Sequence, residues 1–361
     1  MRCVIVSYES CIIRVSTYAV SGFSESACRA ASGALSGFNL QAAGKVMGII
    51  MKNILTFLEE NAIKYKDKTA FVDLNDSVTY AELLERAQSI GSALSKTGTK
   101  NKPIAVYFDK CVNTISAMLG VVYSGNFYVV IDSEMPPARI NKIFGALSPV
   151  AVITDKKHHE NALQLEFSGE IFDLEEALSC EINSEKLAQI RSRQIDTDPL
   201  YALFTSGSTG VPKGAVVSHK SVMAYSEWVS NTFDITSETV FANQTPFYFS
   251  MSVTDVYSTL RNGATLAIVP KMYFSFPIKL VEFLDEYKAN TIYWVPSAIS
   301  MVSNFKVFDF QKPKYLNKVL FAGEVMPTKQ LNYWINNLPE NTLFANLYGP
   351  TETTDICTYY V

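Results

Sequence analysis

Apolar positions recur along this chain with two different periods. In residues 54–63 and 83–94 apolar side chains return every three or four positions, which predicts two amphipathic helices. Thr79 and Glu82 precede the second segment with the spacing of a capping box, in which the two side chains and backbones bond reciprocally. We therefore expect the second helix to begin near Thr79.

Short runs of consecutive apolar residues, rich in Val, Ile and Tyr, alternate with helical patterns through most of the remaining chain. Such runs are typical of parallel strands that are buried on both faces. Pro137, Pro277 and Pro327 each precede a helical pattern, where a first turn tolerates proline. The predicted fold is therefore α/β, with layered parallel sheets covered by helices. The predicted strands are residues 104–108, 128–132, 151–154, 200–204, 215–218, 265–269, 291–295, 318–322 and 343–347.

The two ends of the chain depart from this pattern. Residues 1–50 are rich in Ser, Ala and Gly and keep no period, so we expect an unstructured or non-native leader, with a transit peptide as the alternative. No apolar run there reaches the length of a signal peptide or a membrane span. Residues 355–361 are a β-rich run without a turn or cap. We interpret residues 51–361 as one large domain that is truncated at its C-terminal end.

Composition narrows the possible partners. The chain has 361 residues, of which 48% are hydrophobic, and its net charge is −4. Without a basic cluster, nothing indicates a nucleic-acid surface, which would have to neutralise phosphates. The six cysteines form no CxxC pair, so neither a metal site nor a disulfide framework is indicated and a reducing cytoplasm fits best. These features favour a small-molecule enzyme.

Residues 205–214 carry the clearest chemical signal. They read Thr-Ser-Gly-Ser-Thr-Gly-Val-Pro-Lys-Gly and lie between two predicted strands. Glycines let backbone N–H groups approach oxyanions, the hydroxyls add donors, and Lys213 adds a positive charge. The segment is not a Walker A loop, because Gly214 follows the lysine where that loop has Ser or Thr. A polyphosphate-binding loop is indicated, with an ordinary flexible Ser/Gly loop as the alternative.

This segment resembles the phosphate signature of the adenylate-forming superfamily, which includes acyl-CoA synthetases, luciferases and amino-acid adenylation domains. Residues 346–352, Asn-Leu-Tyr-Gly-Pro-Thr-Glu, resemble the second nucleotide motif of that family, in the expected order and spacing. Residues 128–132 and 321–324 are also similar. The resemblance covers about residues 51–361 and implies the large N-terminal domain of an adenylate-forming enzyme. The family pattern continues beyond residue 361 with a ribose-binding aspartate, a hinge and a small mobile domain that bears a lysine.

The resemblance implies ATP-dependent activation of a carboxylic acid as its acyl-AMP, with release of pyrophosphate. The product would pass to a carrier-protein thiol or to CoA, and this chain alone would be inactive or weakly active. Lys213, Thr351 and Glu352 would be catalytic, and Glu352 would hold Mg²⁺. The implied ATP-binding residues are Thr205, Ser206, Gly207, Ser208, Thr209, Gly210, Lys213, Gly323, Glu324, Asn346, Tyr348, Gly349 and Thr351.

The acid that is activated is indicated less directly. Amino-acid adenylation domains resemble Phe-Asp-x-Ser where this chain has Phe249-Ser-Met-Ser, so the aspartate that pairs with the substrate's ammonium is replaced by Ser250. Asp255 is the nearest acid that could serve, or is a helix-surface charge. The surrounding sequence still looks closest to D-alanine:carrier-protein ligases and amino-acid adenylation domains.

Candidate substrate-binding residues stand at predicted strand ends, where open α/β sheets bind ligands. They are Phe247, Ser250, Trp294 and Ala322, and plain core packing is the alternative for Trp294. An amino acid is the expected substrate and a phosphopantetheinyl carrier protein or CoA the expected acceptor, with no nucleic-acid or membrane partner. The alternatives are an aryl or acyl acid:CoA ligase and a truncated, non-catalytic nucleotide-binding module.

Overall fold

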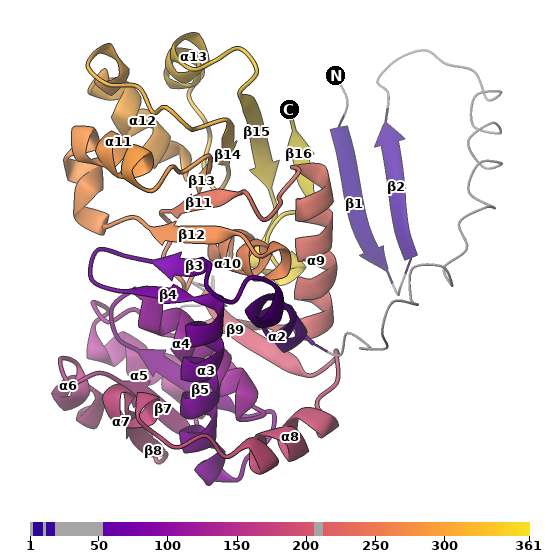
Figure 1. Ribbon diagram of the computed structural model, residues 1–361, viewed down its shortest axis with the longest axis vertical. Helices are drawn as coiled ribbons and strands as arrows, with labels where there is room; N and C mark the ends of the chain where they lie inside the picture. The colour runs from indigo at the N-terminus through magenta and orange to yellow at the C-terminus, as the bar shows by residue number, and fades with distance from the viewer. Residues whose placement is uncertain (1–2, 10–11, 19–52, 206–211) are drawn as a thin grey trace.

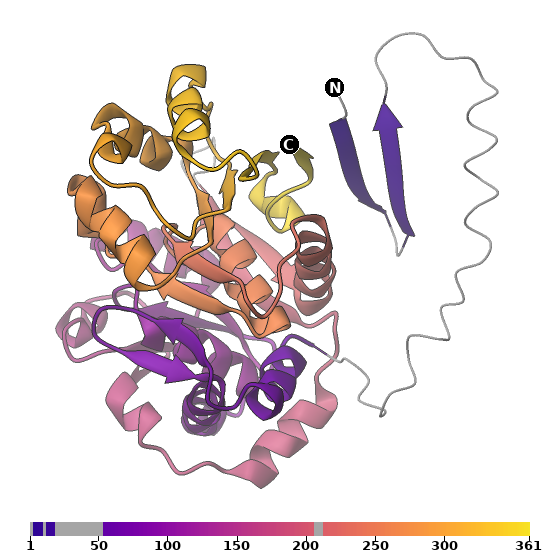
Figure 2. The same ribbon diagram turned by 45° about the horizontal axis from the view of Figure 1, so that its top comes forward.

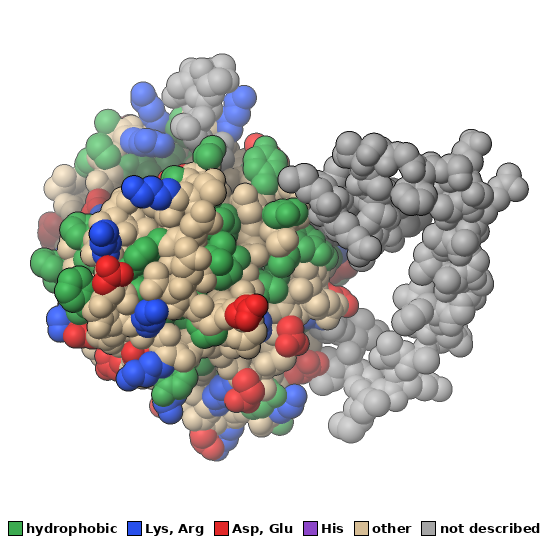
Figure 3. Space-filling view, turned by 90° about the horizontal axis from the view of Figure 1, so that it is seen from above, with side chains coloured by type: hydrophobic (Ala, Val, Ile, Leu, Met, Phe, Trp, Pro, Cys, Tyr) green, Lys and Arg blue, Asp and Glu red, His purple; other side chains and the backbone are tan. Residues whose placement is uncertain are grey.

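The computed structural model describes residues 3–9, 12–18, 53–205 and 212–361. These residues form two mixed sheets, of ten and six strands, with helices on their faces (Figure 1). In the described part of the chain, no helix combines the length and the apolar character needed to cross a membrane. On the face drawn in Figure 3, positive and negative side chains are interspersed, so that face carries no extended basic surface.

The larger sheet is parallel in its middle and antiparallel at its edges. Its strands are β1 (Cys3–Glu9), β2 (Ile12–Tyr18), β3 (Thr69–Val72), β4 (Ser77–Thr79), β11 (Val240–Asn243), β12 (Thr265–Ile268), β13 (Thr291–Trp294), β14 (Lys318–Phe321), β15 (Leu343–Tyr348) and β16 (Thr358–Tyr360). Their order is β2-β1-β16-β15-β14-β13-β11-β12-β3-β4. The ladders from β15 to β3 are parallel, whereas β16, β1, β2 and β4 pair antiparallel with their neighbours.

The smaller sheet has the order β10-β9-β6-β5-β7-β8. Its strands are β5 (Pro103–Tyr107), β6 (Phe127–Val130), β7 (Ala151–Thr154), β8 (Glu170–Asp173), β9 (Pro199–Thr205) and β10 (Lys213–Ser218). All its ladders are parallel except the β9–β10 hairpin at one edge. Thr205 and Lys213, which belong to the segment of residues 205–214, pair with each other at one end of that hairpin.

Helices connect the strands and cover both sheets. The α-helices are α2 (Leu55–Lys64), α3 (Tyr80–Leu94), α4 (Val112–Tyr123), α5 (Pro137–Leu147), α6 (His159–Leu163), α7 (Leu174–Leu178), α8 (Ser184–Arg193), α9 (His219–Thr232), α10 (Met251–Asn262), α11 (Pro277–Glu286), α12 (Pro296–Asn304) and α13 (Thr328–Asn337). Short 3₁₀ helices are η2 (Ser95–Thr97), η3 (Lys271–Ser275), η4 (Val307–Asp309) and η5 (Thr351–Thr353).

Three apolar cores separate the layers. The central core joins one face of each sheet to α2, α3, α4, α9 and α10. A second core lies between the other face of the larger sheet and α11, α12 and α13, which sit together on one side of the molecule (Figures 1 and 2). A third core joins the outer face of the smaller sheet to α5 and α6. The order of layers is therefore helix, sheet, helix, sheet, helix.

Alternation along single strands explains the layering. In β5, Ile104 and Val106 enter the central core while Ala105 and Tyr107 enter the outer core, because successive side chains of a strand point to opposite faces. With both faces covered, every residue of β5 is buried. This is why the sequence shows uninterrupted apolar runs.

The predicted α/β class, the nine strands and the capping box are confirmed. Thr79 accepts from the backbone of Glu82, whose side chain bonds back to Thr79. Pro137 and Pro277 open α5 and α11, and Pro327 stands one residue before α13. The strands β1 and β2 fall in the segment that we expect to be a leader; most of that segment lies outside the described residues, so this division of the chain stays a prediction.

Candidate functional site

The hairpin β9–β10 positions the first motif. Lys213 begins β10 directly opposite Thr205, the last residue of β9, and its side chain is exposed. The intervening residues Ser206, Gly207, Ser208, Thr209 and Gly210 lie outside the described residues, so their predicted contacts with phosphates stay predictions. The lysine stands where the hairpin opens toward the loop.

The second motif begins on β15 and continues into η5. Along β15, Ala345 and Leu347 are buried while Asn346 and Tyr348 are exposed on the other face. Tyr348 is 69% exposed, so its ring is free to stack on a flat ligand. Asn346 and Tyr348 therefore share one accessible face of the sheet at β15.

The two motifs meet in the fold. The helix η5, which carries Thr351 and Glu352, packs beside β10, which begins at Lys213. More than 130 positions of sequence separate η5 from β10, so only the tertiary structure brings these two elements together. The two motifs therefore lie in neighbouring elements of the fold.

Glu352 is exposed and fits a particular kind of cation site. Among the described residues, no group of three or more His, Cys, Asp or Glu side chains could hold a metal ion. Mg²⁺ is commonly bound by one or two carboxylates together with substrate phosphates and water. The single carboxylate of Glu352, on an element that packs beside β10, is compatible with that pattern.

Two glycines of the predicted site are explained by their surroundings. A Cβ on Gly349 would lie 2.0 Å from the carbonyl oxygen of Asp355, so no larger residue fits without moving the backbone. Gly323 follows β14 with a φ of +91°, a conformation that favours glycine. Both positions shape the chain at the carboxyl ends of parallel strands.

Glu324 has a clear structural partner. Its carboxylate accepts from the backbone N–H and the hydroxyl of Ser297, at 2.8 and 3.2 Å. Ser297 lies in the first turn of α12, where backbone N–H groups lack partners and a negative charge is favourable. The side chain of Glu324 thus fixes the turn after β14, which leaves only its backbone for the base-framing role that the sequence implies.

The four predicted substrate residues do not all lie in comparable environments. Phe247 and Ala322 are buried, and Ser250 is half-buried immediately before α10. Trp294 is fully buried in the outer core, where its Nε1 donates to the carbonyl of Ala242 at 2.8 Å. With no accessible surface and its donor bonded, Trp294 takes the core role that was its alternative.

The prediction that Asp255 is a helix-surface charge is wrong. It is fully buried, and its Oδ2 accepts from Asn243 at 2.7 Å. Burial raises the pKa of Asp255 well above its ordinary value, while Asn243 and the nearby Lys110 lower it. Burial lowers the pKa of Lys110 to about 7, and Asp255 opposes that shift. This acid therefore bonds an amide through Oδ2 and lies near a lysine, while its Oδ1 has no hydrogen-bond partner.

A different acid faces Ser250, and the sequence reasoning missed it. Asp355 is 1% exposed, and its Oδ2 accepts from the hydroxyls of Thr254, Tyr225 and Tyr293 at 2.8, 3.0 and 3.2 Å. Burial raises the pKa of Asp355 to about 6, while these hydroxyls and that of Ser250 lower it. The available signal was an acid inside a β-rich apolar run, three residues after the second motif.

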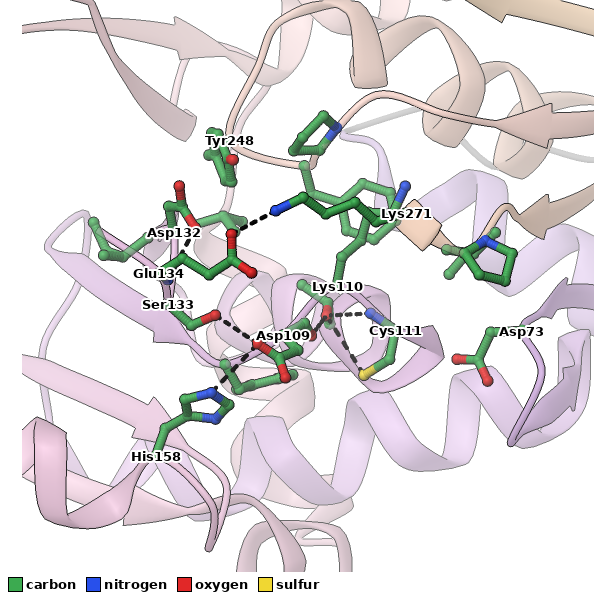
Figure 4. Close-up of a pocket in the computed structure, with 18 of the residues that line it drawn as sticks. Asp73, Asp109, Lys110, Cys111, Asp132, Ser133, Glu134, His158, Tyr248 and Lys271 are labelled. Atoms are coloured by element: carbon green, nitrogen blue, oxygen red, sulfur yellow. Dashed lines mark hydrogen bonds and ion pairs between the residues drawn. The ribbon is translucent and has the colours of Figure 1, made fainter. Parts of the chain in front are cut away.

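A cavity of about 650 Å³ opens elsewhere, at the carboxyl ends of β3, β5, β6, β11 and β12. Of the predicted site residues, only Phe247 lines it. Figure 4 shows charged side chains converging there, and the ion pairs join Lys157 to Asp109 and Lys271 to Glu134. These two ion pairs offset four of the charges that line the cavity.

Comparison with known proteins identifies the family of the chain. A family model described as AMP-binding enzyme matches residues 58–361. A Streptomyces coelicolor L-proline–L-prolyl-carrier protein ligase is 29% identical over 332 residues, which are 87% of this chain and 62% of that protein. A Staphylococcus aureus D-alanine–D-alanyl carrier protein ligase is 30% identical over 305 residues, 84% and 60% respectively. The chain thus spans about three fifths of these relatives.

Solved structures give the same fold. The nonribosomal peptide synthetase FmoA3 matches with a TM-score of 0.75 at 21% identity, over 85% of this chain and 32% of that one. VinN matches with a TM-score of 0.74 at 18% identity, over 85% of this chain and 77% of that one. At these identities the solved structures establish the fold alone. They confirm the layered α/β arrangement that the sequence patterns predict.

Proposed function

Because this chain belongs to the AMP-binding enzyme family, we propose that the whole protein activates an amino acid as its aminoacyl-AMP at the expense of ATP. The activated acyl group then passes to the thiol of a carrier protein. The relatives named above are ligases for L-proline and D-alanine with carrier proteins. The observation that carries the proposal is the packing of η5, with Glu352, beside β10, with Lys213.

The proposed reaction requires no covalent bond between the protein and the substrates. A carboxylate oxygen attacks the α-phosphorus of ATP, the bond from that phosphorus to the α,β-bridging oxygen breaks, and pyrophosphate leaves with the electron pair. Catalysis of such an in-line displacement consists mainly of positioning and of stabilising charge. Mg²⁺, when bound, offsets negative charge on the phosphates.

We assign one role to each candidate residue of the two motifs. Lys213 and the hydroxyl-rich loop before it hold the β- and γ-phosphates, and Thr351 binds the α-phosphate. Tyr348 stacks on adenine, and Asn346 frames the base together with the backbone of residues 323–324. The exposure of Asn346 and Tyr348 on one side of β15 supports this assignment. Glu352 holds the metal.

One observation favours the second candidate, an aryl or acyl acid:CoA ligase. Ser250 is neutral at the position where amino-acid adenylation domains carry an aspartate, and an acid without an amino group would need no carboxylate there. ATP–pyrophosphate exchange by the whole protein, run against amino, aryl and fatty acids, separates the two. Exchange with amino acids supports the first proposal, and exchange with benzoates or fatty acids alone contradicts it.

The metal assignment has its own test in the described chain. Glu352→Gln removes the charge and keeps the shape, so we expect magnesium-dependent ATP binding to weaken while the thermal unfolding curve stays unchanged. Glu340→Gln, at an exposed glutamate outside both motifs, is the control and is expected to bind as the wild type does. ATP affinity of Glu352→Gln equal to wild type at every magnesium concentration would refute the assignment.

The cellular setting is proposed on chemical grounds. Cys111, Cys180 and Cys357 are free thiols, a state that reducing compartments maintain. This supports a cytoplasmic protein.

A further inference from the structure

We propose that Asp355 binds the amino group of the substrate and so replaces the acid that is absent at Ser250. This inference rests on the proposed function and makes it more specific, because it commits the pocket to substrates that carry an ammonium group. It also assigns a residue that lies outside the segment where the resemblance leads one to look for the acid.

The carboxylate of Asp355 is held in one orientation by three elements. Thr254 comes from α10, Tyr225 from α9 and Tyr293 from β13, and all three hydroxyls donate to Oδ2. None of the three donates to Oδ1. Oδ2 is thus used for positioning, and the Ser250 hydroxyl is a further partner of the carboxylate, a neutral donor that a substrate ammonium would replace.

Asp355 and Ser250 belong to the same small region. Ser250 immediately precedes α10, and Thr254 lies one turn further along that helix, so the two project from the same side. Thr254 bonds Asp355 directly, and the Ser250 hydroxyl is close enough to lower the pKa of that carboxyl. An acid at residue 355 therefore faces the position from which an acid at residue 250 would project.

The charge of Asp355 lacks a cation among its direct partners. Its side-chain hydrogen bonds come from neutral hydroxyls, and a buried carboxylate is costly unless it is paired. With a pKa of about 6, the group is mostly ionised at neutral pH. A substrate ammonium supplies the missing positive charge, and the neutral hydroxyls keep the anion available for it.

The other buried acid of α10 does not meet these conditions. Asp255 follows Thr254 directly and so projects about 100° around the helix. Its Oδ2 accepts from Asn243 and its Oδ1 has no hydrogen-bond partner, but unlike Asp355 it has a cation nearby, because Lys110 lowers its pKa while Asp355 raises it. The two acids are equally buried and differ in their partners, which makes Asp255 the matched control for Asp355.

The test measures equilibrium binding to this chain in the presence of Mg·ATP. The ligands are pairs that differ only in the amino group, namely D-alanine with propionate, L-proline with cyclopentanecarboxylate, and other α- and β-amino acids with their desamino acids. We expect the wild type to prefer at least one amine over its partner by more than about tenfold, which is ~1.4 kcal/mol. Asp355→Asn is expected to lose that preference and keep its affinity for ATP, whereas Asp255→Asn keeps both.

An exchange of positions guards against a folding defect. The double variant Ser250→Asp with Asp355→Ser returns the carboxylate to the α10 side of the same contact, and we expect it to recover part of the amine preference. Amine preference that survives in both Asp355→Asn and Asp355→Ser would overturn the inference. So would wild-type chain that binds ATP but binds no amine better than its desamino partner. Failure to bind ATP at all would instead refute the proposed function.

Discussion

The packing of the second nucleotide motif gives a sharp prediction for Gly349→Ala. A Cβ at this position would lie 2.0 Å from the carbonyl oxygen of Asp355 and 2.6 Å from the Cα of Ile356. Both are backbone atoms next to β16, which pairs with β15 through Tyr348 and Leu347. The φ of Gly349 is not positive, so steric contact and not backbone conformation is what requires glycine.

The expected cost follows from this contact. Neither backbone can rotate away as a flexible side chain would, so the added methyl must separate the two segments. Overpacking of this kind typically costs about 1–3 kcal/mol, and each kcal/mol lowers the melting temperature of a domain of this scale by roughly 2–4 °C. Because Tyr348 and Thr351 flank the glycine, we also expect weaker binding of ATP.

The assay is thermal unfolding of wild type and variant, followed by ATP titration. Gly145→Ala is the control, since Gly145 lies in α5 with no atom within 4 Å of its ideal Cβ, and the substitution is expected to add up to about 1 kcal/mol of stability. A melting temperature and an ATP affinity of Gly349→Ala that both equal those of wild type would refute the close approach of the two segments.

Two further outcomes are expected. The pKa of Asp355 is raised to about 6 from 3.8, so between about pH 4 and pH 6 the folded state binds more protons than the unfolded state. The free energy of unfolding therefore falls as pH rises through that window, by roughly 3 kcal/mol. Chemical denaturation at several pH values checks this: the difference in unfolding free energy between wild type and Asp355→Asn should fall across the window, and a constant difference would contradict it. Glu324→Ala should lower stability by about 1 kcal/mol, because Ser297 loses its acceptor, while Glu340→Ala changes nothing; equal melting temperatures for the two variants would remove the structural role of Glu324.

Much of the fold could be predicted from the sequence because its strands are buried on both faces. Such strands, as in β5 and β13, show as uninterrupted apolar runs. The strands β3, β4, β8 and β11 were not predicted. In β8, for example, Glu170 and Asp173 stand at the two ends and the strand is partly exposed, so it gives no continuous apolar run. The capping box at Thr79 could be predicted because it depends on residues three positions apart.

The sequence predicts candidate site residues only within the two motifs, residues 205–214 and 346–352, and at the ends of predicted strands. The neighbourhood of β10 and η5 followed from the resemblance, but the partners of the acids did not. Asp255 was selected as the acid nearest in sequence to Ser250, whereas Asp355 reaches that region through tertiary packing of α9, α10 and β13 around its side chain. The sequence likewise predicts a nucleotide-binding role for Glu324. Its hydrogen bond with Ser297 could not be predicted, because it depends on the packing of the turn after β14 against the start of α12.

The central claim is that the β9–β10 hairpin and residues 346–352 bind one nucleotide together. Calorimetric titration of this chain with Mg·ATP tests it, in the wild type, in Lys213→Ala and Tyr348→Ala, and in Lys329→Ala as an exposed control on α13. We predict that the wild type and the control bind ATP with the same affinity. Each motif variant is expected to bind ATP at least about tenfold more weakly, a loss of ~1.4 kcal/mol in binding free energy. No binding by the wild type, or full affinity in both motif variants, would contradict the claim.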